Sequence, residues 1–188
     1  PNIFVKICGW STAQISRELK IQIKSEFKKI PKRIKLINCV GGGSSAYGFW
    51  SEFIDYEKKQ IELIGVEAGG PSNSKLHAAP LTFGAKLGIL HGAAAYVCQN
   101  SEGQINKTES ISAGLDYPGV SPIHCYLKDA KRARNTSATD EAALKAYKLV
   151  TKLEKINPSL EPSHAFAEAI KIAPKLSKDT IIIVNSCG

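Results

Sequence analysis

The chain has 188 residues, which is room for one domain of ordinary size. Hydrophobic residues make up 43% of it and charged residues 22%, a composition that excludes a disordered chain and is typical of a soluble globular domain. No apolar run approaches the roughly 20 residues that a membrane-spanning helix needs, which excludes an integral membrane protein. The sequence contains no methionine and begins at Pro1, so we expect a processed chain or a piece of a longer one.

The chain is basic, with 25 Lys and Arg against 17 Asp and Glu and a net charge of +8. Positive charge in excess raises the expectation of an anionic partner such as nucleic acid. Here the excess lies in residues 20–35 and 128–134, and the first segment has the pattern of the solvated face of a helix. No zinc-finger spacing, helix-turn-helix or RNA-binding aromatic motif accompanies either segment, so we expect no nucleic-acid partner.

The cysteines are odd in number, scattered, and free of any Cys-x-x-Cys pair: Cys8, Cys39, Cys98, Cys125 and Cys187. Such a set is typical of reduced, mostly buried thiols rather than of a disulfide framework, and it favours a cytosol-like compartment. The histidines lack the spacing of metal ligands, so we expect no structural metal site formed by His77, His91, His124 and His164.

The first half of the chain predicts a helix followed by a strand–helix–strand unit. Apolar residues recur at four-residue steps in a helix over 12–29, which predicts that its inward side chains are Ile15, Leu19, Ile23 and Phe27. Residues 34–40 are a short apolar run typical of a strand buried on both faces. A helix over 46–56, with Phe49, Phe53 and Ile54 inward, then leads to a strand over 61–67. This order is typical of a right-handed crossover between parallel strands.

The second half begins with residues 68–136, which are rich in Gly, Pro and Ser and show little periodicity. A stretch of that length inside a domain indicates a functional segment rather than a linker. Thr139 is a plausible N-cap for a helix to residue 156, whose inward residues we expect to be Leu144, Tyr147 and Leu153. A helix over 164–172, opened by Pro162 and Ser163, and a strand over 180–184 complete an α/β fold with a parallel sheet.

The turn Gly41-Gly42-Gly43-Ser44-Ser45 lies between a predicted buried strand and a helix. Glycines let the backbone turn tightly and direct several amides to one point, and the serines add hydroxyl groups, so the turn suits a phosphate monoester. It matches neither the dinucleotide-binding fingerprint nor the Walker A loop. A tight strand-to-helix turn without a ligand is the alternative interpretation of these residues.

Polar groups also follow the last predicted strand, in Val184-Asn-Ser-Cys-Gly188, at the edge where open α/β sheets bind ligands. Glu161 and Asp116 are carboxylates near predicted element ends, and each is either a site residue or a cap or turn residue. No Gly-x-Ser-x-Gly motif is present, so nothing favours a hydrolase.

Taken together, the motifs resemble those of the tryptophan synthase β family, in order and spacing, over nearly the whole chain. The strings that carry the resemblance are Cys39-Val-Gly-Gly-Gly-Ser-Ser45, Leu63-Ile-Gly-Val-Glu-Ala-Gly-Gly70, Ala79-Pro-Leu81, Glu102-Gly-Gln-Ile105, Ser110-Ile-Ser-Ala-Gly-Leu-Asp-Tyr-Pro118, Leu160-Glu-Pro-Ser-His-Ala165 and Val184-Asn-Ser-Cys-Gly188. The resemblance implies a three-layer α/β fold, a mostly parallel sheet flanked by helices, as in the carboxyl-terminal domain of fold-type II pyridoxal-phosphate (PLP) enzymes. It also implies the condensation of L-serine with indole to L-tryptophan.

The resemblance also assigns roles to residues. The phosphate of the PLP cofactor would be held by Gly41, Gly42, Gly43, Ser44 and Ser45. Glu161 would lie beside the pyridine ring and tune its protonation, Cys187 would meet the ring nitrogen, and Asp116 would contact the serine hydroxyl in the closed state. A monovalent cation, Na⁺ or K⁺, would bind backbone carbonyls of Gly41, Tyr117 and Gly119.

Several residues depart from the family pattern. Cys187 stands where the family has Ser, and a thiol is a weaker hydrogen-bonding group than a hydroxyl. Ser45 stands where the family has Asn, and Leu90-His91 replaces an aromatic pair that lines the indole tunnel. Pro162 replaces a small polar residue beside Glu161. Together these departures suggest a divergent member.

The family's Schiff-base lysine follows a histidine, and no His-Lys pair occurs in this sequence. We therefore expect residues 1–188 to be the carboxyl-terminal, phosphate-binding part of a longer two-domain chain, inactive on its own. The parent would be a cytoplasmic homodimer with a possible tryptophan synthase α subunit as partner and no membrane attachment. The alternatives are a non-catalytic or divergent fold-type II PLP-binding relative and a serine or threonine dehydratase-like enzyme.

Overall fold

The computed structural model describes residues 2–187, and their side chains from residue 7 onward. Its centre is a parallel sheet of strand order β5-β2-β1-β6. The strands are β1 (Ile34–Cys39), β2 (Ile61–Ala68), β5 (Ala133–Ala138) and β6 (Ile181–Val184). In the described part of the chain, no helix is both long enough and apolar enough to cross a membrane.

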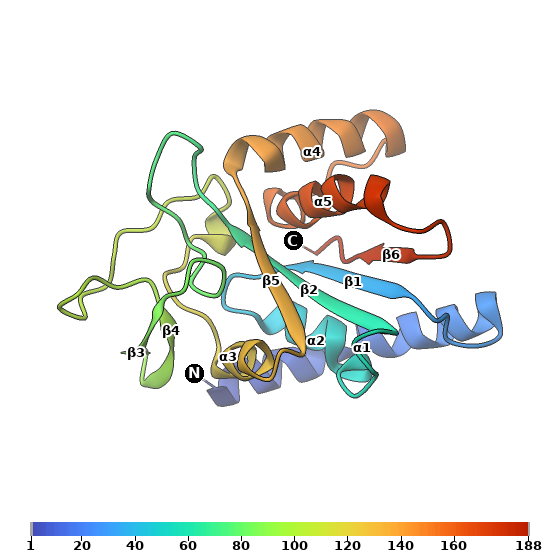
Figure 1. Cartoon of the computed structure of the whole chain (residues 1–188), viewed down its shortest axis with the longest axis horizontal. Helices are drawn as coiled ribbons and strands as arrows, with labels where there is room; N and C mark the ends of the chain where they lie inside the picture. Colours follow the sequence, from blue (N-terminus) through green and yellow to red (C-terminus); the bar gives the residue numbers. More distant parts are fainter. Residues whose placement is uncertain (1, 188) are drawn as a thin grey trace.

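Helices cover both faces of the sheet and make three layers (Figure 1). One face carries α1 (Asn2–Phe27), α2 (Ser44–Trp50) and α3 (Pro122–Asp129), and the other carries α4 (Asp140–Glu154) and α5 (Leu160–Ile172). Two apolar clusters fill the spaces between layers, with Trp50 and Leu36 in one and Ile37 and Ala165 in the other. Successive side chains of β1 thus enter opposite clusters, which confirms a strand buried on both faces.

The strand–helix–strand unit is confirmed, with a shorter helix than expected. The predicted helix over 46–56 is α2, which begins at Ser44, followed by one 3-10 turn, η1 (Ser51–Phe53). Phe49 and Phe53 are buried as predicted, and Trp50, which the pattern did not single out, is fully buried between them.

Helix α1 begins ten residues before the predicted start and turns a different face to the core. Ile15 and Phe27 are exposed, so their predicted inward positions are wrong, whereas Ala13 and Ser16 are buried with Ile23. The cause is close contact with α2: a Cβ on Gly48 would lie 1.9 Å from the hydroxyl oxygen of Thr12. Ser16 and Ser51 share a hydrogen bond of 2.8 Å across the same contact. Small residues let the two backbones approach, and this overrides the apolar period.

Residues 68–136 contain more regular structure than their sequence suggested. They form an antiparallel hairpin of β3 (Lys86–Leu90) and β4 (Ala93–Val97), the 3-10 turn η2 (Ala113–Leu115), helix α3 and strand β5. Strand β5 pairs with β2 from Ala133 opposite Leu63 to Ala138 opposite Ala68. It escaped prediction because it is a polar edge strand, buried only at its two ends.

The last two helices follow the predictions with two corrections. The hydroxyl of Thr139 accepts the amide of Ala142, which confirms the N-cap of α4, but Leu153 is 64% exposed rather than inward. The core side of α4 is instead made by small residues, Ala143 and Ala146. Helix α5 begins at Leu160, so Glu161 lies in its first turn and not before it.

Candidate functional site

The glycine turn (residues 41–45) joins the carboxyl end of β1 to α2, and two of its glycines are fixed by their surroundings. Gly43 has φ +99°, and a Cβ there would lie 2.2 Å from the ring of His124. A Cβ on Gly41 would lie 2.5 Å from the carbonyl oxygen of Gly114. A Cβ on Gly42 would meet nothing within 4 Å, so the middle of the turn faces open space.

Two carbonyl groups of this turn accept hydrogen bonds, whereas the amides of its three glycines donate none to the described residues. The carbonyl of Gly42 accepts the amide of Ser121 at 3.1 Å, and that of Gly43 accepts the amide of Tyr47 at 3.0 Å. Within the described residues, no hydrogen bond outside the helices and strands uses the amide of Gly41, Gly42 or Gly43 as donor. A run of free amides around one concavity is the arrangement that binds anions.

His124, in α3, holds the glycine turn in place through its ring. Its Nε2 atom lies 2.7 Å from the carbonyl oxygen of Gly43. Burial lowers the pKa of His124 to about 4, so the ring is neutral and its Nε2–H donates to that carbonyl. Nδ1 has no partner among the described residues. The sequence did not point to His124, because a histidine in a helix far along the chain gives no sign that it faces residue 43.

The predicted cofactor residues line one cavity of about 210 Å³, which we call the glycine-turn cavity. Its walls come from the glycine turn, from the 3-10 turn η2, from the first turn of α5 and from the segment after β6. The lining residues are Cys39, Gly41, Gly42, Gly43, Ser44, Ser45, Gly114, Leu115, Glu161 and Cys187. The structure thus brings together segments that are far apart in the sequence, at the carboxyl edge of the parallel strands.

Glu161 is the acidic group of this cavity. Its Oε1 accepts the amide of Gly114 at 3.0 Å. Burial acts to raise the pKa of Glu161, but hydrogen bonds from its own amide and from that of Gly114 outweigh it and hold the pKa below its usual value. Glu161 is therefore a carboxylate at neutral pH, fixed against the 3-10 turn η2 by the amide of Gly114.

Cys187 and Ser45 complete the wall. The Cys187 sulfur lies 3.5 Å from that of Cys39, and this hydrogen bond lowers the pKa of Cys187 to about 6 while it raises that of Cys39. The hydroxyl oxygen of Ser45 accepts the side-chain amides of Asn38 at 3.4 Å and Asn185 at 3.3 Å. Ser45 is thereby tied to the ends of both β1 and β6.

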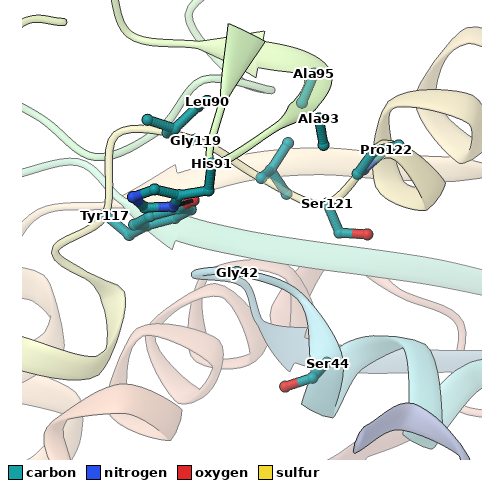
Figure 2. Close-up of a pocket in the computed structure, with 11 residues that line it drawn as sticks. Gly42, Ser44, Leu90, His91, Ala93, Ala95, Tyr117, Gly119, Ser121 and Pro122 are labelled. Atoms are coloured by element: carbon teal, nitrogen blue, oxygen red, sulfur yellow. Dashed lines mark hydrogen bonds between the residues drawn. The ribbon is translucent and has the colours of Figure 1, made fainter. Parts of the chain in front are cut away.

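A second, apolar cavity of about 410 Å³ adjoins the first, and Gly42 and Ser44 line both. Figure 2 shows its walls, made by β3, β4 and the segment leading into α3. The ring of His91 stacks on that of Tyr117, with His91 Nδ1 2.9 Å from the tyrosine oxygen. The remaining lining is mostly aliphatic or small: Leu90, Ala93, Ala95, Gly119, Val120, Ser121 and Pro122.

The other predicted site residues lie near these cavities. Tyr117 and Gly119 line the apolar cavity, whereas Gly41, expected to share a cation with them, lines the glycine-turn cavity. Asp116 ends the 3-10 turn η2, is exposed, and lines neither cavity.

Comparison with known proteins decides the family resemblance. No protein-family model matches the chain. Over 175 residues, 93% of its length, it is 47% identical to the tryptophan synthase beta chain of Chromobacterium violaceum. It is 49% identical to that of Fusobacterium nucleatum over the same share. This chain is a relative of tryptophan synthase β chains. It spans about 43% of the length of the two relatives.

Solved structures agree with this tryptophan synthase β relative in fold. A fungal L-serine ammonia-lyase from Rhizomucor miehei has a TM-score of 0.64 at 19% identity, covering 96% of this chain and 51% of its own. A threonine deaminase from T.th. has a TM-score of 0.63 at 15% identity, covering 94% of this chain and 56% of its own. These likenesses confirm the fold class, a mostly parallel sheet flanked by helices.

Proposed function

We propose that this chain is the carboxyl-terminal, cofactor-binding part of a tryptophan synthase β chain whose full-length form condenses L-serine with indole. The observation that carries the proposal is the glycine-turn cavity, in which the turn, Glu161 and Cys187 converge from distant parts of the sequence. The high identity to tryptophan synthase β chains supports it against the dehydratase alternative, for which the likeness is one of fold.

The residues of the cavity fit PLP. The free amides of Gly41, Gly42 and Gly43 would hold its phosphate, because they are donors without partners and no side chain fills the space before Gly42. Ser44 adds a hydroxyl, and Ser45 contributes less directly, since its oxygen already accepts two amides. The positioning group is His124, which keeps the carbonyl of Gly43 turned inward.

The opposite wall would receive the pyridine ring. PLP, when bound, supplies an electron sink for the amino-acid substrate. Glu161 would lie beside the ring as a fixed carboxylate. Cys187 would face the ring nitrogen, and the hydrogen bond that it shares with Cys39 lowers the pKa of its thiol to about 6.

The apolar cavity would receive the indole. Its aliphatic walls suit a flat apolar molecule, and the residues that it shares with the glycine-turn cavity place it directly beside the cofactor. His91 and Tyr117 form its polar end. Asp116, on the neighbouring turn, would reach the serine hydroxyl only if the loop closed over the cavity.

The remaining assignments belong to the parent protein. We propose a PLP-dependent homodimer in the cytoplasm, a tryptophan synthase α subunit as its partner, and a monovalent cation on carbonyls of Gly41, Tyr117 and Gly119. The covalent lysine would come from another part of the parent, so we expect this chain alone to form no tryptophan from serine and indole. Turnover by the purified 188-residue chain would contradict that expectation.

Phosphate-directed binding is the decisive test. Pyridoxine 5′-phosphate is the probe, because as an alcohol it does not react with the chain's many lysines. We expect it to bind, and pyridoxine without the phosphate to bind at least about tenfold more weakly, since charge-assisted hydrogen bonds are the strong ones. Gly42→Asp, which puts a carboxylate into the open space of the turn, should abolish the difference. The matched control is Ser101→Asp, the same charge change on an exposed loop. If Gly42→Asp and Ser101→Asp bound pyridoxine 5′-phosphate with equal affinity, the proposal would be overturned.

A further inference from the structure

Two cysteines meet at the carboxyl edge of the sheet. Cys39 ends β1, and Cys187 lies three residues after the end of β6. The two strands are parallel neighbours, with Ile37 opposite Val184 and the amide of Asn185 bonded to the carbonyl of Ile37 at 3.1 Å. This pairing carries the two side chains to the same place, with 3.5 Å between the sulfur atoms.

The two thiols differ in what surrounds them. Cys39 is 5% exposed and packs in the apolar cluster under α5. Cys187 is half-buried, and both residues line the glycine-turn cavity, so small molecules in that cavity reach the pair. Cys187 is the more exposed of the two, so it is the thiol that a small molecule in the cavity meets first, and the sulfur of Cys39 lies 3.5 Å from it.

We propose that Cys39 and Cys187 are an oxidation site at which a hydroperoxide converts the two thiols into an intrachain disulfide. First the Cys187 sulfur attacks one peroxide oxygen, the O–O bond breaks, and Cys187 becomes a sulfenic acid; the other peroxide oxygen leaves with the thiol proton, as water from hydrogen peroxide or as an alcohol from an alkyl hydroperoxide. Then the sulfur of Cys39 attacks that of Cys187, the S–O bond breaks, and the hydroxyl leaves with the proton of Cys39 as water. The two thiols lose two electrons and the peroxide gains them.

Formation of the disulfide requires a small movement of one sulfur atom. A disulfide bond is about 2.05 Å long, so the sulfurs approach by about 1.5 Å. Cys39 is held inside a strand, whereas Cys187 lies beyond the last strand residue, and so Cys187 moves. The movement draws its sulfur toward Cys39, and the disulfide has no thiol proton to offer a ligand in the cavity that both residues line. The pair thus couples the redox state of the chain to the glycine-turn cavity.

The test is to treat the purified 188-residue chain with hydrogen peroxide and to count free thiols by alkylation under denaturing conditions. We expect two of the five thiols to be lost together, with a mass decrease of about 2 Da for two hydrogens. Peptide mapping should show a Cys39–Cys187 crosslink that dithiothreitol reverses. In the variants Cys39→Ser and Cys187→Ser no crosslink forms, whereas the control Cys8→Ser behaves as wild type.

Three results would overturn the proposal: loss of thiols one at a time, a crosslink between other cysteines, or peroxide oxidation of Cys39 that is unchanged in Cys187→Ser. Should either serine variant fail to fold, the wild-type chain still decides. A trivalent arsenical binds paired thiols, and it should bind one per chain and block the peroxide crosslink; a chain that binds none contradicts the pairing. None of these readouts requires PLP, so they are independent of the proposed function.

Discussion

Acid should destabilise this chain through His124, because the ring that supports the glycine turn is held neutral in a buried position. In the unfolded chain the imidazole takes up a proton near its ordinary pKa of about 6.5. In the folded chain burial lowers that pKa to about 4. Between these values the unfolded state binds more protons, so the free energy of unfolding falls as the pH falls. The stability contributed by the neutral His124 ring is fully present above about pH 6.5 and is lost as the pH approaches 4.

The magnitude follows from the two pKa values. One pKa unit corresponds to about 1.4 kcal/mol, so the whole shift is worth about 3 kcal/mol. Between about pH 7.5 and about pH 5 the folded chain should lose about 2 kcal/mol through this group, as the linkage relation gives. His124→Gln removes the titration, while its side-chain amide still donates to the carbonyl of Gly43 in place of Nε2–H.

Urea unfolding of wild type and His124→Gln at the two pH values measures this directly. The difference in unfolding free energy between the two proteins, wild type minus variant, should shrink by about 2 kcal/mol on acidification. If wild type and His124→Gln lose stability in parallel, the neutral buried imidazole is refuted.

Two other predictions concern groups outside the site. Burial raises the pKa of Glu67 to about 7, although hydrogen bonds from Leu81 and Thr82 act to lower it. The folded chain therefore holds a proton on Glu67 that the unfolded chain has lost, and the unfolding free energy of wild type minus that of Glu67→Gln should fall by about 2.5 kcal/mol from about pH 5 to about pH 8. Urea unfolding measures this difference, and an unchanged value would contradict the raised pKa. The guanidinium group of Arg132 donates hydrogen bonds to three backbone carbonyls. A lysine cannot reach all three, so Arg132→Lys should lower the unfolding free energy by about 1–3 kcal/mol. An unchanged urea midpoint would show that these hydrogen bonds do not stabilise the fold.

The sheet was predictable where strands are buried on both faces. Residues 34–40 and 61–67 are short apolar runs, and they became β1 and β2 with nearly the predicted ends. Strand β5 could not be predicted in the same way. Its middle residues are polar and half-buried, and Arg134 is held by Glu62 and Glu168 from two other elements. Only tertiary contacts make this segment a strand.

The site was predictable where residues are adjacent in sequence and hidden where they are not. The glycine turn could be identified from its composition and its place after a strand. His124 lies 81 positions from Gly43, and Cys187 lies 148 positions from Cys39. These contacts depend on strand order and register, which no local pattern contains. Glu161 and the segment 184–188 could be singled out from their places at element ends, the family resemblance gave Glu161 and Cys187 their roles, and the fold places both at the same cavity.

Binding of a phosphate ester by the glycine turn can be observed directly at the backbone amides of the turn. In a titration of the ¹⁵N-labelled chain with pyridoxine 5′-phosphate, the amide resonances of Gly41, Gly42 and Gly43 should move together with saturation. Those of Gly84 and Gly103, which lie in remote turns, should stay fixed. Two results would contradict phosphate binding at the glycine turn: no movement of the three turn amides at saturation, or movement confined to the basic cavity lined by Arg33, Lys35, Lys58, Lys59 and Lys175.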